Sequence, residues 1–254
     1  MRIIACFKAV PDNDHIGVNP DRSISVGGEF AAGQYDFNAI EAAARLKAEC
    51  EGSTVAVLTV CADEDRCTSK IKKAVLSRGA DELYAVVDPA LKGADALVTA
   101  QALAAAVRKI GADLVVCGEG SGDMYAQQTG VVLGSLLGWP TLNAVCGLSL
   151  CAGGVAVKRM SENETEEYEL SLPAAIAVTS DINVPRIASL KEIMAAGRKP
   201  STVWSAADLG AELKKGRESL STLAPRQTDR RRDIVKGEDA EAVAALYEKL
   251  RRVL

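Results

Sequence analysis

The feature that most constrains the fold is a regular alternation of short apolar segments with helix-like segments through the first half of the chain. The strand-like segments comprise residues 2–10, 54–60, 82–87 and 114–117. The helix-like segments comprise residues 36–49, 63–77 and 94–110. Asp36 is a candidate N-cap for the first of these helices. Because parallel strands joined by helices form right-handed crossovers, the alternation predicts an α/β fold with a doubly wound parallel sheet covered on both faces.

The second half of the chain changes to a hairpin-like pattern. Strand-like segments at 148–150, 155–160, 167–172 and 174–179 surround two polar turns. Earlier in the chain, residues 11–30 have the composition of a polar loop or a short hairpin. The sequence therefore predicts an added β-hairpin region beside the parallel sheet.

The last part of the chain is polar and charged. A helix is expected over 190–196, with Gly197 as its C-cap, and Pro200 follows it. Beyond this point come the basic cluster 230–232 and an amphipathic helix over 239–253. We therefore expect one domain over residues 1–200 and a C-terminal arm over residues 201–254.

Composition narrows the classes of partner. The chain has 254 residues, of which 48% are hydrophobic, so it can bury a substantial core. Its net charge of −4 gives no overall basic field for nucleic acid or anionic lipid. The first residues lack the apolar region and cleavage site of a signal peptide, and we expect no membrane insertion. We expect small molecules or proteins as partners, and no leader.

The cysteines and the single histidine argue against several kinds of site. The seven cysteines form no C-x-x-C pair and are odd in number, which disfavours a disulfide framework or a structural zinc site and indicates reduced thiols in the cytoplasm. A catalytic triad or a multi-histidine metal site would depend on His15 alone. No paired carboxylates and no nucleophile with a base are evident, so we expect no catalytic residues and no metal site.

The loop after the fourth strand has the composition of a phosphate-binding turn. Gly118, Gly120 and Gly122 remove side chains that would keep a ligand from the backbone, and glycine also permits positive φ. A helix is expected from Met124 onward, so its free N–H groups would face a ligand in the loop. Named motifs do not match, since Asp123 stands where G-x-G-x-x-G has its third glycine and no Lys-Ser/Thr pair follows. The loop alone leaves nucleotide binding and simple packing as open alternatives.

Other strand ends belong to the same edge of the predicted sheet. Ligands of open parallel sheets bind beyond the carboxyl ends of the strands. Cys6 and Cys61 would be small walls of such a cleft, or simply buried thiols. Lys8 could offset phosphate charge or be solvated, and Asp123 could cap the following helix or accept a ribose hydroxyl.

Four blocks of this sequence resemble a known family. They are IIACFKAVPD (3–12), QYDFNAIEAAARLK (34–47), GEGSGDMYAQQTG (118–130) and VKRMSENETEEYELSLPAAIAVTSDINVPRIASLKEIMAAGRKP (157–200). Together they resemble the β-subunit of electron-transfer flavoproteins, and most closely its Fix-type branch. The resemblance extends from Met1 to about Pro200 and into the stretch VWSAADLG. It implies a sheet of the adenine nucleotide α-hydrolase type.

The resemblance also implies a function. Members of this family form a heterodimer with a larger α-subunit, whose FAD relays electrons from an acyl-CoA dehydrogenase-like donor to a quinone-reductase-like or other acceptor. The β-subunit binds AMP, or a second FAD in bifurcating members, and is an electron-carrier subunit without independent catalysis. The triplet Gln128-Thr129-Gly130 is similar to AMP-binding members, so AMP is the first expectation and FAD the alternative.

The family pattern implies two sets of functional residues. The expected nucleotide-binding residues are Cys6, Gly33, Gln34, Tyr35, Asp36, Cys61, Gly118, Glu119, Gly120, Ser121, Gly122, Asp123, Met124, Tyr125, Ala126, Gln127, Gln128 and Thr129. The segment 182–194 matches the family's recognition loop, which docks redox partners through a leucine. Leu190 falls at that position, with Ile193 and Met194 beside it. Without the family pattern, Leu190 would be read as a residue folded onto its own domain.

Other functions of the same fold stay open. A stand-alone adenine-nucleotide-binding regulatory protein would use the same loop and need no partner. An ATP pyrophosphatase-like enzyme would require a Ser-Gly-Gly-x-Asp loop after the first strand, where this chain has Lys8-Ala9-Val10-Pro11-Asp12. That second alternative ranks last.

Overall fold

The computed structural model describes residues 1–226 and 232–252. The chain divides into two compact units. One comprises Met1–Gly17 with Ser25–Ser221, and the other comprises Val18–Ile24 with Thr222–Leu254. We call them the main unit and the second unit, and describe each by itself.

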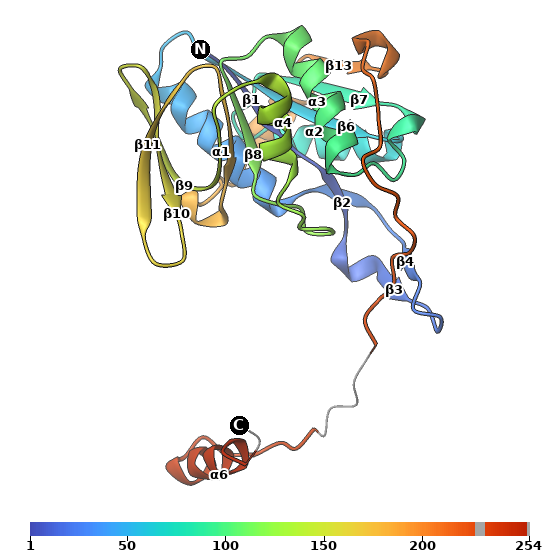
Figure 1. Ribbon diagram of the computed structural model, residues 1–254, viewed down its shortest axis with the longest axis vertical. Helices are drawn as coiled ribbons and strands as arrows, with labels where there is room; N and C mark the ends of the chain where they lie inside the picture. Colours follow the sequence, from blue (N-terminus) through green and yellow to red (C-terminus); the bar gives the residue numbers. More distant parts are fainter. Residues whose placement is uncertain (227–231, 253–254) are drawn as a thin grey trace. The chain divides into compact units, whose positions relative to one another are not determined.

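The main unit is built on a nine-stranded sheet with the order β11-β10-β9-β12-β8-β1-β6-β7-β13 (Figure 1). The strands are β1 (Arg2–Cys6), β6 (Thr54–Cys61), β7 (Glu82–Val87), β8 (Leu114–Gly118), β9 (Thr141–Cys151), β10 (Gly154–Met160), β11 (Thr165–Ser171), β12 (Ala174–Val178) and β13 (Ser201–Trp204). Strands β9, β12, β8, β1, β6, β7 and β13 pair in parallel, whereas β10 pairs antiparallel with β9 and β11. The predicted α/β class with a parallel sheet and an added hairpin region is confirmed, and the hairpin strands extend the same sheet.

Helices cover both faces of this sheet. Alternate residues of β1 show the two layers: Ile3 and Ala5 pack against one hydrophobic cluster, and Ile4 and Cys6 pack against the other. The helices of the main unit are α1 (Gln34–Glu49), α2 (Ser69–Leu76), α3 (Ala96–Ile110), α4 (Thr129–Leu137) and α5 (Leu190–Ala196). Side chains of α1, α2 and α5 belong to the first cluster, and side chains of α3 and α4 belong to the second. Figure 1 shows α3 and α4 in front of the sheet.

Several predicted elements differ in their bounds. The expected strand 2–10 is two strands, β1 and β2 (Ala9–Pro11), and β2 leaves the main sheet to pair with β5 (Phe30–Ala32). The expected helix 63–77 breaks at Thr68, whose hydroxyl accepts the Ile71 N–H at 3.4 Å and starts α2 after a separate 3-10 turn. Thr68 is therefore an N-cap inside a segment that periodicity assigned to one helix.

Strand β9 is longer than the sequence predicted, and strand β13 was not predicted at all. Strand β9 spans eleven residues, whereas only 148–150 read as a strand, because its first half is half-buried and carries Ala144 at a φ of 54°. Strand β13 lies in the polar stretch after Pro200 and pairs with β7 at the edge of the sheet. Residues 201–221 thus belong to the main unit.

The region 11–30 contains the predicted hairpin as β3 (Ile16–Val18) and β4 (Ile24–Val26). In the second unit, the Ala224 N–H donates to the Arg22 carbonyl at 2.9 Å. Its helix α6 (Ala240–Leu250) is N-capped by Asp239, which accepts the Ala242 N–H at 2.8 Å.

The last predicted helix was placed over 239–253, and α6 occupies most of that range. Its predicted final residue Val253, and Arg230 and Arg231 of the basic cluster, lie outside the described residues. None of the helices in the described ranges is long and apolar enough to cross a membrane.

Candidate functional site

A pocket of about 180 Å³ opens at the carboxyl ends of β1 and β8, where the sequence predicted a ligand. This is more than ten times the roughly 15 Å³ that one water needs, so it has room for part of an organic ligand. Its apolar wall includes Val60, Leu103 and Ala177, and its polar wall includes the loop after β8. Apolar walls with a few converging polar groups are typical of small-molecule sites.

Two helices begin at this pocket, and they differ in their caps. At α3 the Asp95 carboxylate accepts the Val98 N–H at 2.8 Å, so this helix start is already occupied by a side chain. At α4 the N-cap is Gln128, and no side chain caps the helix. Thr129 and Gly130, the first residues of α4, line the pocket. Their uncapped N–H groups and the positive end of the helix favour an anion at α4.

The loop before α4 differs from the prediction. The helix begins at Thr129 instead of Met124, because residues 121–125 form a turn in which the Tyr125 N–H donates to the Ser121 carbonyl at 2.9 Å. Tyr125 and Gln127 have positive φ angles of 41° and 54°. Non-glycine residues rarely adopt this region, so the turn carries backbone strain at the pocket.

The expectation that the loop glycines are needed for positive φ angles was wrong. Gly118, Gly120 and Gly122 do not lie in the left-handed region. A Cβ on Gly118 would lie 2.7 Å from Asp36 Oδ1 and 2.9 Å from the Tyr35 backbone, so this glycine allows α1 to approach β8. A Cβ on Gly120 would meet the Tyr125 ring at 2.6 Å, whereas Gly122 has nothing within 4 Å.

Asp36 is a buried carboxylate at the pocket and is not the N-cap of α1. Gly33 is the N-cap, and Asp36 lies in the first turn, where its Oδ2 accepts the Lys8 N–H at 2.8 Å. The Gly118 N–H also donates to this carboxylate. Burial raises the pKa of Asp36 to about 7, although the hydrogen bonds from Lys8 and Gly118 oppose this shift. The carboxylate thus ties the ends of β1 and β8 to the start of α1.

Lys8 and Asp123 form an ion pair across the pocket edge. Lys8 Nζ lies 2.7 Å from both carboxylate oxygens of Asp123 and 3.4 Å from Ser121 Oγ. Burial opposes ionisation of Asp123, but the hydrogen bonds from Lys8 and Ser121 hold its pKa below the ordinary value. Asp123 therefore neutralises Lys8 and does not cap α4.

The two predicted cysteine walls lie in different places. Cys6 lines the pocket beside Cys117 of the neighbouring strand, and the hydrogen bond with Cys117, together with burial, raises the pKa of the Cys6 thiol. Cys61 does not line the pocket, and burial raises the pKa of its thiol to about 12. Raised thiol pKa values disfavour the thiolate, so neither side chain is a reactive nucleophile.

The predicted nucleotide-binding set divides accordingly. The members that line the pocket are Cys6, Asp36, Gly118, Glu119, Gly120, Ser121, Met124, Ala126, Gln127, Gln128 and Thr129. The members outside its lining are Gly33, Gln34, Tyr35, Cys61, Gly122, Asp123 and Tyr125. The rings of Tyr35 and Tyr125 lie 5.3 Å apart at 49°, and thus support the loop from outside the pocket.

A comparison with known families shows the kind of protein to which this pocket belongs. The family model described as the electron transfer flavoprotein domain matches residues 25–209, which include the loop, the pocket's α4 and helix α5. The chain belongs to this family. Members of the electron transfer flavoprotein family are electron carriers associated with flavin rather than enzymes.

Sequence reasoning missed part of the pocket of this electron transfer flavoprotein domain. The missed lining residues at the start of α3 are Ala94, Asp95, Ala96 and Thr99. The turn residue Gly93 followed by Asp95 before an alanine-rich helix was a usable signal of a helix start at the third strand's end. Arg217 also lines the pocket, but it lies in a polar stretch beyond the matched family domain and has no local motif.

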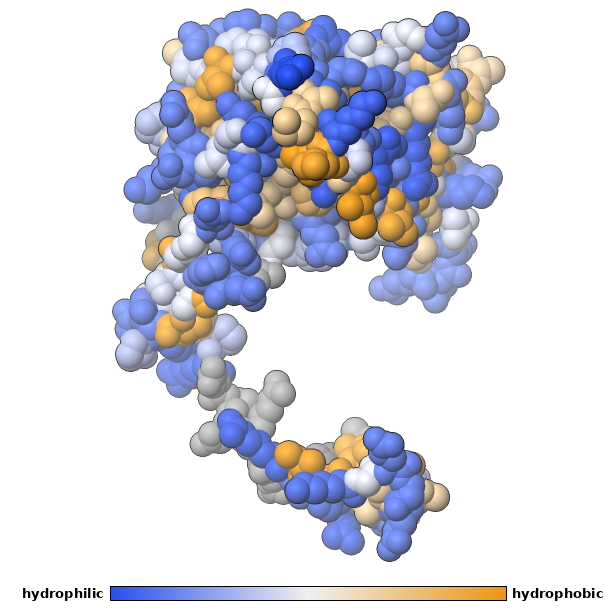
Figure 2. Space-filling model, turned by 180° about the vertical axis from the view of Figure 1, so that it is seen from behind, coloured by the Kyte–Doolittle hydropathy of each residue, from blue (hydrophilic) through white to orange (hydrophobic). Residues whose placement is uncertain are grey.

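Helix α5 carries the predicted docking residues of the electron transfer flavoprotein domain. Leu190 and Met194 are 77% and 68% exposed, and Ile193 is 38% exposed, so the alternative in which Leu190 folds onto its own domain does not hold. The Ser189 and Glu192 side chains form a capping box that fixes the start of this short helix. Figure 2, seen from the side opposite to α3 and α4, shows exposed hydrophobic side chains gathered on the main unit.

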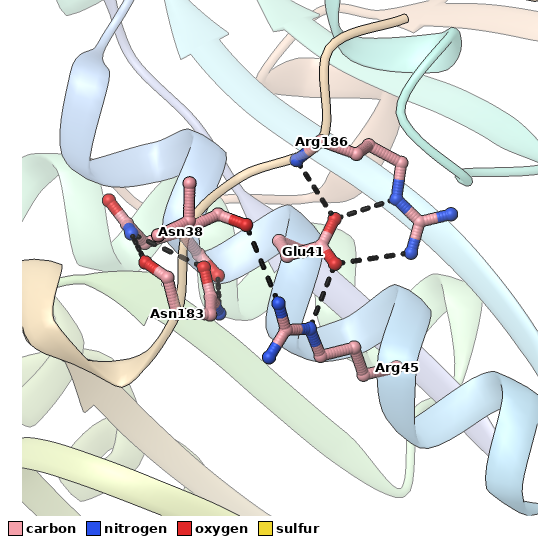
Figure 3. Close-up of polar contacts among 6 residues, drawn as sticks. Asn38, Glu41, Arg45, Asn183 and Arg186 are labelled. Carbon is pink, nitrogen blue, oxygen red and sulfur yellow. Dashed lines mark hydrogen bonds and ion pairs between the residues drawn. The ribbon is translucent and has the colours of Figure 1, made fainter.

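The segment before α5 is fastened to α1 (Figure 3). The Glu41 carboxylate accepts Arg186 Nε at 2.6 Å and Arg45 Nε at 2.9 Å. The Asn38 amide donates to the Asn183 carbonyl at 2.8 Å, and the Asn183 amide donates back to the Asn38 carbonyl at 3.0 Å. Polar contacts with α1 therefore hold the segment that leads to the exposed apolar residues of α5.

Proposed function

We propose that this chain is the β-type subunit of an electron-transfer flavoprotein of the Fix-type branch. In this proposal it binds AMP in the pocket and pairs with an α-subunit whose FAD relays electrons from a dehydrogenase to an acceptor. The observation that carries the proposal is the uncapped start of α4, which opens into a pocket with an apolar wall. An adenylate needs both features, because its phosphate is anionic and its base is flat and largely apolar.

The pocket residues divide between the parts of such a nucleotide. The backbone N–H groups of Thr129 and Gly130 would bind the phosphate. Val60, Leu103 and Ala177 would contact the base. The nucleotide has a structural role in this proposal, and flavin supplies the redox chemistry when bound.

A second FAD in the same pocket is the alternative ligand. The triplet Gln128-Thr129-Gly130 is similar to AMP-binding members and supports AMP as the first choice. The adenylate half of FAD would use the same contacts at α4. The two ligands differ in flavin content, so counting flavin per dimer separates them.

Two protein surfaces complete the proposal. Leu190, Ile193 and Met194 would dock an acyl-CoA dehydrogenase-like donor and a quinone-reductase-like or other acceptor. The C-terminal arm, predicted over 201–254, would contact the α-subunit through its residues beyond 221, and the exposed apolar side chains of α6 support this part. Those side chains are Val243, Leu246, Tyr247 and Leu250. A cytoplasmic location is supported by the seven cysteines, each of which is a free thiol.

Co-expression with the α-subunit tests the proposal. We expect a stable heterodimer that releases one FAD and one AMP per dimer, and a colourless β-chain when it is expressed alone. Two FAD and no AMP would support the alternative ligand. A partner-independent homodimer that binds ATP and ignores the α-subunit would contradict the subunit role and favour a stand-alone regulatory protein.

A further inference from the structure

Arg217 reaches the pocket from a segment that sequence reasoning assigned to the C-terminal arm. Residues 211–221 follow β13 in the main unit and run along α3. The Lys214 N–H donates to Gln101 Oε1 at 2.8 Å, and Leu213 packs against the hydrophobic cluster that contains α3. The segment is therefore attached to the helix before it reaches the pocket.

Asp95 fixes the backbone at Arg217. Besides the Val98 N–H, its carboxylate accepts the N–H groups of Gly216 and Arg217, and these hydrogen bonds, led by that from Val98, hold the pKa of Asp95 below its ordinary value. A Cβ on Gly216 would lie 3.0 Å from Leu97 Cδ2, so the backbone is close to α3 at this point. Arg217 thus lines the pocket from a backbone position that Asp95 anchors.

The charged residues of the pocket favour an anion beside Arg217. The ionisable carboxylic and basic residues in its lining are Lys8, Asp36, Asp95, Glu119 and Arg217. Lys8 is already paired with Asp123 at 2.7 Å. Among the described residues no ion pair joins Arg217 to a carboxylate, although its charge helps to lower the pKa of Asp95, after the hydrogen bonds from Val98 and Gly216. A phosphate of charge about −1.5 to −2 entering among these acids needs such a cation.

We propose that Arg217 is a ligand-binding residue that donates guanidinium N–H groups to the phosphate of the bound adenylate. The inference rests on the proposed function, because it requires an adenine nucleotide in this pocket. A guanidinium presents a planar fork of donors that fits phosphate oxygens and keeps its charge at every physiological pH. Arg217 would complement the α4 backbone with a full positive charge, and it lies outside the residues that match the family domain.

The test compares AMP with adenosine, which lacks the phosphate. Nucleotide-stripped heterodimers carrying Arg217→Ala, Arg217→Lys or Lys215→Ala are titrated with each compound by calorimetry. Lys215 is the matched control, since it is an exposed cation two residues away that does not line the pocket. We expect Arg217→Ala to weaken AMP binding about tenfold and to change adenosine binding less than twofold. Arg217→Lys should retain part of the affinity, and Lys215→Ala should retain all of it.

The outcomes separate this inference from the function on which it rests. Unchanged AMP affinity in Arg217→Ala, with a parent that binds AMP, would overturn the role of Arg217 alone. An equal loss for AMP and adenosine would also overturn it, because the effect would not depend on the phosphate. A parent heterodimer that binds no adenine nucleotide would overturn the proposed function and this inference together.

Discussion

The Glu41 carboxylate on α1 binds the Arg186 guanidinium of the segment before α5, with Nε 2.6 Å from Oε2 and the Arg186 backbone N–H directed at the same oxygen. The Glu41 side chain is 6% exposed, while that of Arg186 is 40% exposed. Burial opposes ionisation of Glu41, but the hydrogen bonds from Arg186 and Arg45 hold its pKa below the ordinary value. One buried acid therefore links the helix that borders the pocket to the segment that presents Leu190.

Replacing Glu41 should loosen that link. We expect Glu41→Gln to lower the free energy of unfolding by about 1–2 kcal/mol, since both arginines keep access to water after the loss of the charge. Glu167→Gln is the control, because Glu167 is 71% exposed and pairs with Lys158 at a similar distance of 2.8 Å. Its cost should be clearly smaller than that of Glu41→Gln, because water screens an exposed ion pair. Denaturant unfolding measures both, and equal costs would contradict the role of Glu41.

Asp36 should make stability depend on pH in an unusual direction. Its pKa rises from 3.8 to about 7 on folding, so the folded protein holds a proton between these values that the unfolded chain has released. The contribution of Asp36 to the free energy of unfolding therefore falls as pH rises through this window, by about 2–3 kcal/mol between pH 5 and pH 8. The parent should lose stability over that range relative to Asp36→Asn, measured by denaturant unfolding. Parallel pH profiles of the two proteins would refute the assignment.

The loop glycines should separate packing from ligand approach. Gly118→Ala places a Cβ 2.7 Å from Asp36 and 2.9 Å from the Tyr35 backbone, and we expect a loss of about 1–3 kcal/mol in the free energy of unfolding. Gly122→Ala meets nothing within 4 Å and should stay within about 0.5 kcal/mol of the parent. Thermal unfolding of the two variants is the measurement. A destabilised Gly122→Ala with an unaffected Gly118→Ala would show that the packing account is wrong.

Leu190 should act in docking and not in folding. We expect Leu190→Ala to raise the KM for the electron donor about tenfold, because an exposed leucine that fills a partner's pocket contributes mainly at that interface. Leu220→Ala is the control, since Leu220 is 90% exposed and lies outside α5. Steady-state reduction of the heterodimer measures both variants, together with their nucleotide content. Parent-like kinetics in Leu190→Ala would remove the docking role.

Much of the main unit could be predicted from the alternation of strands and helices. The segments that became β6, β7, β8 and α3 have regular periodicity and lie in the core, where burial and pattern agree. Strand β13 could not be read in this way, because it is an exposed edge strand stabilised by pairing with β7. The break at Thr68 was missed because a single capping hydroxyl outweighed the helical pattern around it.

The candidate site, like the fold, could be predicted from the sequence only in part. Its position at the ends of β1 and β8 followed from the sheet topology, and the glycine loop marked it in the sequence. The role of each glycine could not be predicted, because Gly118 depends on the approach of α1 from residues far away in the chain. Arg217 could not be found either, since its place at the pocket depends on the path of residues 211–221 along α3.

The most direct measurement is an experimental density map of the heterodimer purified with its native ligands. We expect an adenylate in the pocket, with its phosphate within hydrogen-bond distance of the Thr129 and Gly130 backbone N–H groups and of the Arg217 guanidinium. A pocket filled by the chain's own Tyr125 and Met124 side chains, with no nucleotide at the start of α4, would contradict it.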